Sequence, residues 1–283
     1  MKFECHGHIM ADGNSYNDAA ALHEKAPDIR HIRTAFKALQ ACDVGYFRDG
    51  GDRFGVSIVA KKLAPQYEID YVTAGFIICR EGYYGAMYGF SYRDMAGARE
   101  LILRAKSLGA DFIKTTVSGM LDFGGDGGVM GPSTGYAELH ELVNIANGEG
   151  MRVMAHCNGV ENIKNSLRAG VSSLEHGFWA DDECVALLGE TGAIWVPTCA
   201  PAKNVLGCGK FNDATLKNIL EHQYEMLKKA SDLGVLIASG SDCGAHLVPH
   251  GKGTDDEYAI LSSLGIDTTI ANKKLAALFR RMR

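Results

Sequence analysis

The chain has 283 residues, of which 46% are hydrophobic and 22% are charged, and it contains only six prolines. This composition is typical of a folded globular protein, and the length fits either two ordinary domains or one (β/α)₈ barrel of about 250 residues. The net charge of −5 argues against nucleic acid or an anionic membrane as a main partner, because no basic stripe is available to bind either.

The sequence carries no targeting or disulfide signal. The first residues lack the apolar stretch of a signal peptide, and no window approaches 18 consecutive apolar residues. The eight cysteines are scattered and form no C-x-x-C pair, which favours reduced, mostly buried thiols over disulfides or a zinc knuckle. We therefore expect a cytoplasmic protein without a membrane segment.

Eight short apolar or β-branched segments alternate with longer amphipathic segments. The expected strands are residues 3–8, 44–48, 69–79, 111–117, 151–156, 171–176, 193–198 and 235–239. The helical patterns between them include residues 19–41, 92–108, 136–147, 212–233 and 255–264. Glycine precedes a strand at several joins, where a left-handed residue permits a tight turn: Gly109, Gly150, Gly170, Gly192 and Gly234.

The alternation of strands and helices favours a closed parallel barrel over an open doubly wound sheet. Neither G-x-G-x-x-G nor G-x-x-x-x-G-K-[ST] occurs, so nucleotide binding has no support. No linker or low-complexity segment divides the chain. We expect residues 1–283 to form one (β/α)₈ TIM barrel domain.

Two loops follow predicted strands on the face where barrels carry their active sites. Residues 119–135 are rich in glycine and could form either a flexible surface loop or a mobile lid. Residues 83–90 are rich in aromatic side chains and could form either a hydrophobic cap or the wall of a substrate pocket.

Histidine or aspartate stands at the end of four predicted strands. His6 and His8 are two residues apart and share one strand face, so both imidazoles can point at one ion. His156, His176 and Asp242 end or follow three other strands. Each residue alone is a weak signal, but four imidazoles and a carboxylate in one pocket need a cation. These ligand types suit zinc and other first-row metals.

Neighbouring residues have less certain assignments. Lys114, in the fourth predicted strand, could extend its ammonium to solvent. Cys5 and Cys157 adjoin proposed ligands but face the opposite side of their strands, so we expect them to be core thiols. His246 and His250 follow the eighth strand, where a substrate contact and an ordinary loop position are both open.

These residues lie in motifs that resemble the amidohydrolase superfamily, in its branch of imidazolonepropionase-like and prolidase-like enzymes. The motifs run from residue 6 to residue 251, so the resemblance covers nearly the whole chain. They are His6-Gly7-His8, Arg48-Asp49-Gly50-Gly51, residues 109–114 (GADFIK), Ser118-Gly119, residues 155–159 (AHCNG), residues 169–177 (AGVSSLEHG), Gly240-Ser241-Asp242 and Pro249-His250-Gly251.

The resemblance implies a centre of two divalent metal ions, with zinc expected. Lys114 would be carboxylated on Nζ and bridge both ions, since a carbamate offers two anionic oxygens. His6, His8 and Asp242 would hold one ion, and His156 and His176 the other. A bridging hydroxide would be the nucleophile, and Asp242 would carry its proton to the leaving amine.

The implied reaction is hydrolysis of an amide-type C–N bond in a small molecule, either cyclic or dipeptide-like. We expect substrate contacts from Tyr84, His250 and Asn158, although the family often has an aromatic residue or histidine at the Asn158 position. A lactonase or other ester hydrolase is an alternative on the same site. A mononuclear deaminase would leave Lys114 unexplained. A catalytically silent metal-binding barrel is the alternative from another class.

Relatives usually carry a small accessory β-sandwich built from both chain ends, and this chain is expected to lack it. Residues 268–283 form an amphipathic helical pattern that must pack on its own barrel or on a neighbour. The apolar side comprises Ile270, Leu275, Leu278 and Phe279, and the charged side mostly Lys273, Lys274, Arg280 and Arg281. The missing sandwich favours a neighbour, and hence a homo-oligomer.

Overall fold

The computed structural model describes residues 1–280. Its strands are β1 (Lys2–Gly7), β2 (Val44–Asp49), β3 (Asp70–Thr73), β4 (Ile77–Arg80), β5 (Gly89–Tyr92), β6 (Ile113–Thr116), β7 (Val153–Cys157), β8 (Ser173–His176) and β9 (Ile194–Val196). Its helices are α1 (Tyr16–His23), α2 (Ile29–Ala41), α3 (Val56–Leu63), α4 (Met95–Ser107), α5 (Tyr136–Gly148), α6 (Val160–Ala169), α7 (Asp182–Thr191), α8 (Ala200–Asn204), α9 (Asp213–Asp232), α10 (Lys252–Ser263) and α11 (Thr269–Phe279), with a short 3₁₀ helix at Ala64–Tyr67.

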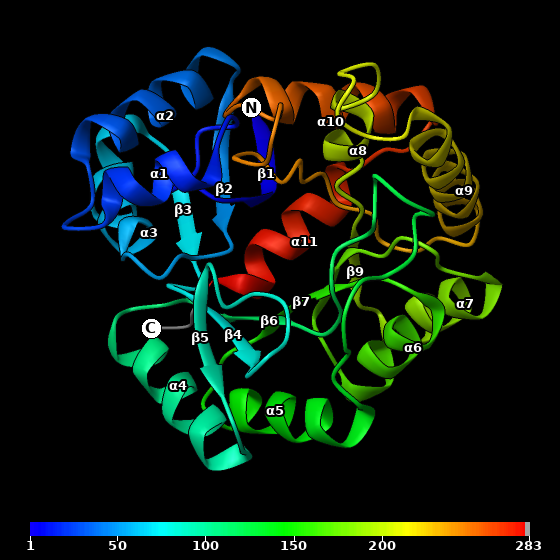
Figure 1. The fold of residues 1–283 in the computed structure, drawn as a ribbon, viewed down its shortest axis with the longest axis horizontal. Helices are drawn as coiled ribbons and strands as arrows, with labels where there is room; N and C mark the ends of the chain where they lie inside the picture. Colours follow the sequence, from blue (N-terminus) through cyan, green and yellow to red (C-terminus); the bar gives the residue numbers. More distant parts are fainter. Residues whose placement is uncertain (281–283) are drawn as a thin grey trace.

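The strands form two parallel sheets, which confirms an α/β fold. One sheet has the order β1-β2-β3 and the other the order β5-β4-β6-β7-β8-β9, and every neighbouring pair is parallel. Figure 1 shows most of the helices, among them α2, α4, α5, α6, α7, α9 and α10, around the outside of the strands. The largest apolar core fills the space between the strands and this outer layer. Within each sheet the carboxyl ends of the strands therefore lie at the same edge.

The third predicted strand, residues 69–79, is divided between the two sheets. β3 pairs with β2, whereas β4 pairs with β6. The backbone turns between them at Gly75, whose φ of +73° is readily adopted only by glycine. β3 also meets the segment before β6, since the amide of Asp111 donates to the carbonyl of Thr73 at 2.8 Å.

The eighth predicted strand, residues 235–239, is not a named strand in the structure. Its backbone still bonds on both sides, because Ile237 forms a parallel bridge with Trp195 of β9 and the amide of Cys5 in β1 donates to the carbonyl of Ser239. These contacts are too few for a continuous ladder. β5, in contrast, begins at Gly89 in the last two residues of the aromatic loop, where no strand was predicted.

The predicted helices are present, with one division. Residues 19–41 form two helices, α1 and α2, because Pro27 interrupts the pattern and Asp28 begins a new helix by accepting from the amides of Arg30 and His31. The predicted left-handed glycines are confirmed by positive φ at Gly109, Gly150, Gly170, Gly192 and Gly234. No helix among residues 1–280 has the length and apolar character needed to cross a membrane.

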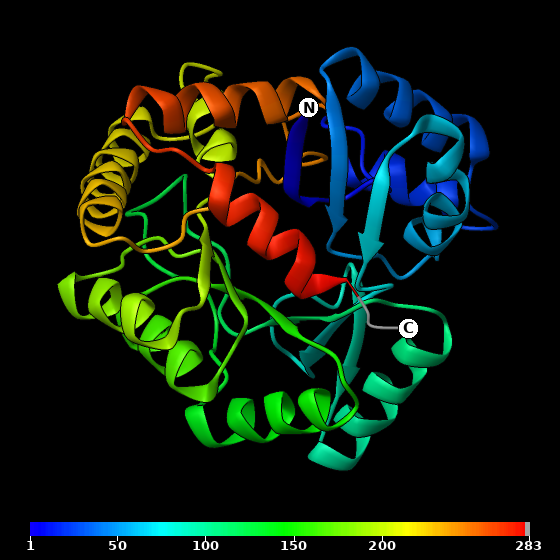
Figure 2. The same cartoon turned by 180° about the vertical axis from the view of Figure 1, so that it is seen from behind.

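The C-terminal amphipathic helix is confirmed as α11, but the expectation that it packs on a second copy is wrong. Figure 2 shows α11 crossing the centre of the molecule on the face where the strands begin. Leu275 and Phe279 are buried against this chain's own Phe112 and Met154. Ile270, assigned to the apolar side, is 63% exposed. The homo-oligomer stays a prediction without this support, and Arg281 lies outside the described residues.

Candidate metal centre

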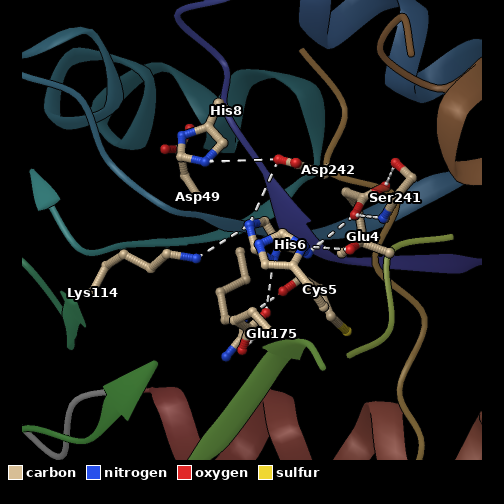
Figure 3. A network of polar contacts seen from close by, with 12 residues as sticks. Glu4, Cys5, His6, His8, Asp49, Lys114, Glu175, Ser241 and Asp242 are labelled. Atoms are coloured by element: carbon tan, nitrogen blue, oxygen red, sulfur yellow. Dashed lines mark hydrogen bonds and ion pairs between the residues drawn. The ribbon is translucent and has the colours of Figure 1, made fainter. Parts of the chain in front are cut away.

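The predicted ligands come together at the floor of one cavity of about 560 Å³. All six line it: His6, His8, Lys114, His156, His176 and Asp242. Figure 3 shows His6 at the middle of the cluster, with contacts to Lys114 and Asp242. The Nε2 atoms of His6 and His8 lie 3.6 and 3.8 Å from Oδ1 of Asp242, and the candidate ligand atoms of these three residues are all within 4.8 Å of one another.

The other two histidines complete the cluster from the neighbouring strands. His176, at the end of β8, has its ring centroid 4.4 Å from that of His156 on β7 and 5.0 Å from that of His6. Lys114 reaches the cluster from β6, with its Nζ 3.2 Å from Nε2 of His6. The parallel register of adjacent strands brings these side chains together, since β6, β7 and β8 are consecutive in the sheet.

Each imidazole has one ring nitrogen held by a group outside the cluster. Nδ1 of His6 lies 2.7 Å from a Glu175 oxygen. Nδ1 of His8 lies 3.1 Å from the Gly51 carbonyl, and Nδ1 of His176 lies 2.6 Å from the Thr198 hydroxyl. In His156 the held nitrogen is Nε2, which lies 3.1 Å from the Gly119 carbonyl. Such bonds orient imidazoles and leave the second nitrogen available as a ligand. The donor set therefore fits divalent metal ions.

Burial changes the protonation of these groups. It lowers the pKa of His8 and of His156 to about 3 and the pKa of His6 and His176 well below the usual value, with the nearby Lys114 charge adding to the effect. Four neutral imidazoles result, which is the form that binds a metal. Burial also lowers the pKa of Lys114 to about 8, against the attraction of Glu175 and Asp242.

Asp242 combines a carboxyl group of raised pKa with an unusual backbone conformation. Burial raises its pKa to about 7, although Lys114 opposes the shift and 23% of the side chain stays exposed. Its backbone φ is +55°, and positive φ also occurs at His176 and Thr198. Non-glycine residues in this region cost energy and often cluster at functional sites. The backbone just before Asp242 is also tightly packed against β1, since a Cβ at Gly240 would lie 2.8 Å from the His6 backbone nitrogen.

The glycine-rich loop is an ordered hairpin that forms one wall of the cavity. Leu121 and Val129 form an antiparallel bridge, and the amide of Met130 donates to the carbonyl of Met120 at 2.9 Å. The Trp179 indole holds the tip by donating to Gly127 at 2.7 Å. Aromatic-loop residues Tyr84, Met87 and Tyr88 also line the cavity, in agreement with the pocket-wall interpretation.

The predicted substrate contacts have different positions. Tyr84 lines the cavity, with its ring centroid 4.9 Å from that of His156. Asn158 also lines it, but its side chain bonds the Gly119 carbonyl and the Phe178 amide. His250 lies outside the cavity lining, with its Nε2 3.3 Å from the His8 carbonyl. His250 therefore reaches the cavity only through His8.

Sequence reasoning gave no role to two buried charged residues behind the cluster, Glu175 and Arg48. Glu175 is next to His176 on β8, but its side chain contacts His6. Both residues were visible inside the matched motifs, and a carboxylate within a predicted strand is a usable signal, because charged residues are rarely buried without a partner. Cys5 and Cys157 are buried free thiols, as expected.

The arrangement defines an α/β protein with a histidine-rich, metal-compatible centre at the ends of parallel strands. No protein-family model matches the sequence. Ochratoxinase of Aspergillus niger is 28% identical over 282 residues, which covers 85% of this chain. The chain spans only 56% of the length of that enzyme. An uncharacterized protein of Mycobacterium tuberculosis is 28% identical over 134 residues, 45% of this chain and 36% of that protein.

Solved structures share the fold. A Xaa-Pro dipeptidase with bound methionine superimposes with a TM-score of 0.79 at 22% identity, covering 98% of this chain and 75% of the other. Aspergillus niger ochratoxinase gives a TM-score of 0.78 at 23% identity, covering 99% and 71%. These comparisons agree with the sequence resemblance to prolidase-like amidohydrolases, and the solved structures show that the fold is shared.

Proposed function

We propose that this protein is a metal-dependent hydrolase that cleaves an amide-type C–N bond. The observation that carries the proposal is the convergence of four neutral imidazoles, Lys114 and Asp242 on one cavity floor, with each imidazole held by an outer partner. The similarity to ochratoxinase and to a Xaa-Pro dipeptidase supports a hydrolase of this kind.

Two divalent ions, zinc by preference, are proposed as cofactors. His6, His8 and Asp242 would hold one ion, His156 and His176 the other, and a carboxylated Lys114 would bridge them. Burial supports the modification of Lys114, because a pKa lowered to about 8 leaves an appreciable fraction of neutral amine near neutral pH. The neutral amine is the form that can add carbon dioxide. Bound ions would supply an activated water and polarise the scissile carbonyl.

Side chains in the cavity would transfer the proton and contact the substrate. Asp242 stands at the cavity floor with a pKa near 7, which suits a group that accepts a proton and then returns it to the leaving amine. Three other residues that line the cavity, Met120, Phe123 and Phe211, are apolar and would exclude water from an apolar part of the substrate. Tyr84 and Asn158 stay candidates for direct substrate contact.

Strands β1, β2, β3, β6, β7, β8 and β9, together with residues 235–239, would close into one eight-stranded barrel. The contact between Asp111 and Thr73 at one junction, and the bonds of residues 235–239 to β9 and β1 at the other, support this closure. Closure would explain why β1, β6, β7 and β8 bring their ends to one point. A cytoplasmic location and a homo-oligomer stay predictions, and light scattering on the purified chain tests the second.

A substrate panel tests the proposal. Zinc-loaded protein is assayed with Xaa-Pro dipeptides, N-acyl amino acids, ochratoxin, and lactones or simple esters, in parallel with protein stripped of metal by a chelator. We expect zinc-dependent release of an amine from at least one amide. Turnover of lactones or esters alone would favour the ester-hydrolase alternative. Metal binding without any turnover would favour a silent metal-binding protein.

A further inference from the structure

Glu175 is a fully buried carboxylate in direct contact with a proposed metal ligand. One of its oxygens lies 2.7 Å from Nδ1 of His6, on the side of the ring away from Asp242, as Figure 3 shows. The Ser173 hydroxyl also donates to Glu175. Through this contact Glu175 fixes both the rotation of the His6 ring and the nitrogen that carries its proton.

Arg48 supports Glu175 from behind. Its Nη2 lies 2.9 Å from both carboxylate oxygens, its Nη1 donates to Ser173 at 2.9 Å, and its Nε donates to the Cys5 carbonyl. Neither Arg48 nor Glu175 is exposed. A buried ion pair is often no more stabilising than apolar residues of the same size, so fold stability alone does not account for the pair.

The C-terminal helix completes this arrangement. The guanidinium of Arg48 lies 4.4 Å from the ring centroid of Phe279 in α11, a geometry in which a cation and an aromatic face attract. Phe279 is itself buried and packs edge-on against Phe112. A continuous set of contacts therefore joins α11 on one face of the strands to His6 on the other.

We infer that Glu175, Arg48 and Phe279 are positioning residues for the metal centre, acting through His6. The inference rests on the proposed function, since it assumes that His6 binds an ion. Glu175 makes the His6 imidazole a better donor by holding its Nδ1 proton, Arg48 holds Glu175 in place, and Phe279 extends the support to α11. The C-terminal helix is thus part of the structure that sets metal affinity.

Metal affinity measured with Co²⁺ alone tests the inference. Apoprotein competes with a chelating dye for Co²⁺, and the visible absorption of the bound ion reports on its ligands. We expect Glu175→Gln to weaken binding by about 10- to 100-fold, the usual effect of removing an outer partner of a ligating histidine. The matched control is Glu257→Gln, which alters another fully buried carboxylate, one that accepts only from the amides of Cys199 and Ala200 among described residues.

Glu175→Gln leaves Arg48 buried without its partner, so a second variant guards against misfolding. The pair Arg48→Met with Glu175→Gln removes both charges, and we expect it to fold while binding Co²⁺ as weakly as Glu175→Gln. Phe279→Ala should weaken binding in the same direction. Leu188→Ala, which removes a buried side chain from α7 in the outer layer, should not.

The outcomes separate the inference from the proposed function. Wild-type protein that binds no Co²⁺ would overturn both. Wild-type protein that binds Co²⁺, with Glu175→Gln and the double variant within about twofold of its affinity, would overturn the inference alone. An equal loss in Glu257→Gln would overturn it too, because the effect would then belong to any buried carboxylate.

Discussion

Replacing Asp242 by asparagine should remove most turnover while preserving fold and metal. Asparagine has nearly the same shape and tolerates the left-handed backbone at this position, where φ is +55°. It cannot accept and return a proton near neutral pH. Among the described residues that line the cavity, the only other carboxylate is that of Asp122, whose Oδ1 accepts from the amides of Gly124 and Gly125. No second carboxylate among these residues therefore stands beside Asp242 to take over its role.

The expected loss in kcat is about 10²- to 10⁴-fold, the range of general acid–base catalysis, equivalent to about 2.7–5.4 kcal/mol of barrier. The assay compares kcat and KM of wild-type and variant protein, with zinc content and thermal unfolding measured on the same samples. Asp126→Asn, at the hairpin tip outside the cavity lining, is the matched control and should keep wild-type rates. Wild-type kcat in a zinc-loaded Asp242→Asn protein would refute the assignment.

Three further predictions concern metal content, packing and pH. Lys114→Ala should lower zinc content, measured after growth with zinc and bicarbonate, from about two ions per chain toward one, because the bridge is lost. Leu275→Ala should cost about 2–5 kcal/mol in urea unfolding, since this α11 side chain is fully buried, whereas the exposed Ile270→Ala should change stability by less than about 0.5 kcal/mol. Burial raises the pKa of Glu257 to about 8, above its unfolded value, so the folded state binds the extra proton. Wild-type stability should therefore fall between about pH 5 and pH 8 more steeply than that of Glu257→Gln, and equal slopes in chemical unfolding would contradict this.

The convergence of the candidate ligands was predictable because it depends on local rules. Two residues apart on one strand, His6 and His8 share a face, and His156 and His176 end their own strands. The Asp242 position follows the eighth predicted segment. The structure brings all five to one cavity, although residues 235–239 lack a continuous ladder.

Long-range side-chain partners were not predictable in the same way. Arg48 and Glu175 are 127 residues apart and lie in different sheets, so their contact depends on how β2 and β8 are placed in space rather than on any spacing in the sequence. The packing of α11 was not predictable for the same reason. Its amphipathic pattern predicted a helix correctly, but the pattern does not say which surface covers Leu275 and Phe279. Tertiary packing on this chain's own strands supplied the answer.

The division of residues 69–79 has a local cause that periodicity does not report. The apolar pattern continues through the segment, yet Gly75 turns the backbone so that β3 and β4 pair with different sheets. The extra strand β5 follows from this change, because it pairs along β4.

We propose that metal bound at the His6 cluster makes this protein an amide hydrolase. The most direct measurement titrates Zn²⁺ into chelator-stripped protein, in bicarbonate buffer, while following hydrolysis of an amide substrate identified in the panel. We expect no turnover without metal and a rate that rises and levels off at about two equivalents of zinc per chain. Full turnover in the stripped protein, or a rate that zinc does not change, would contradict it.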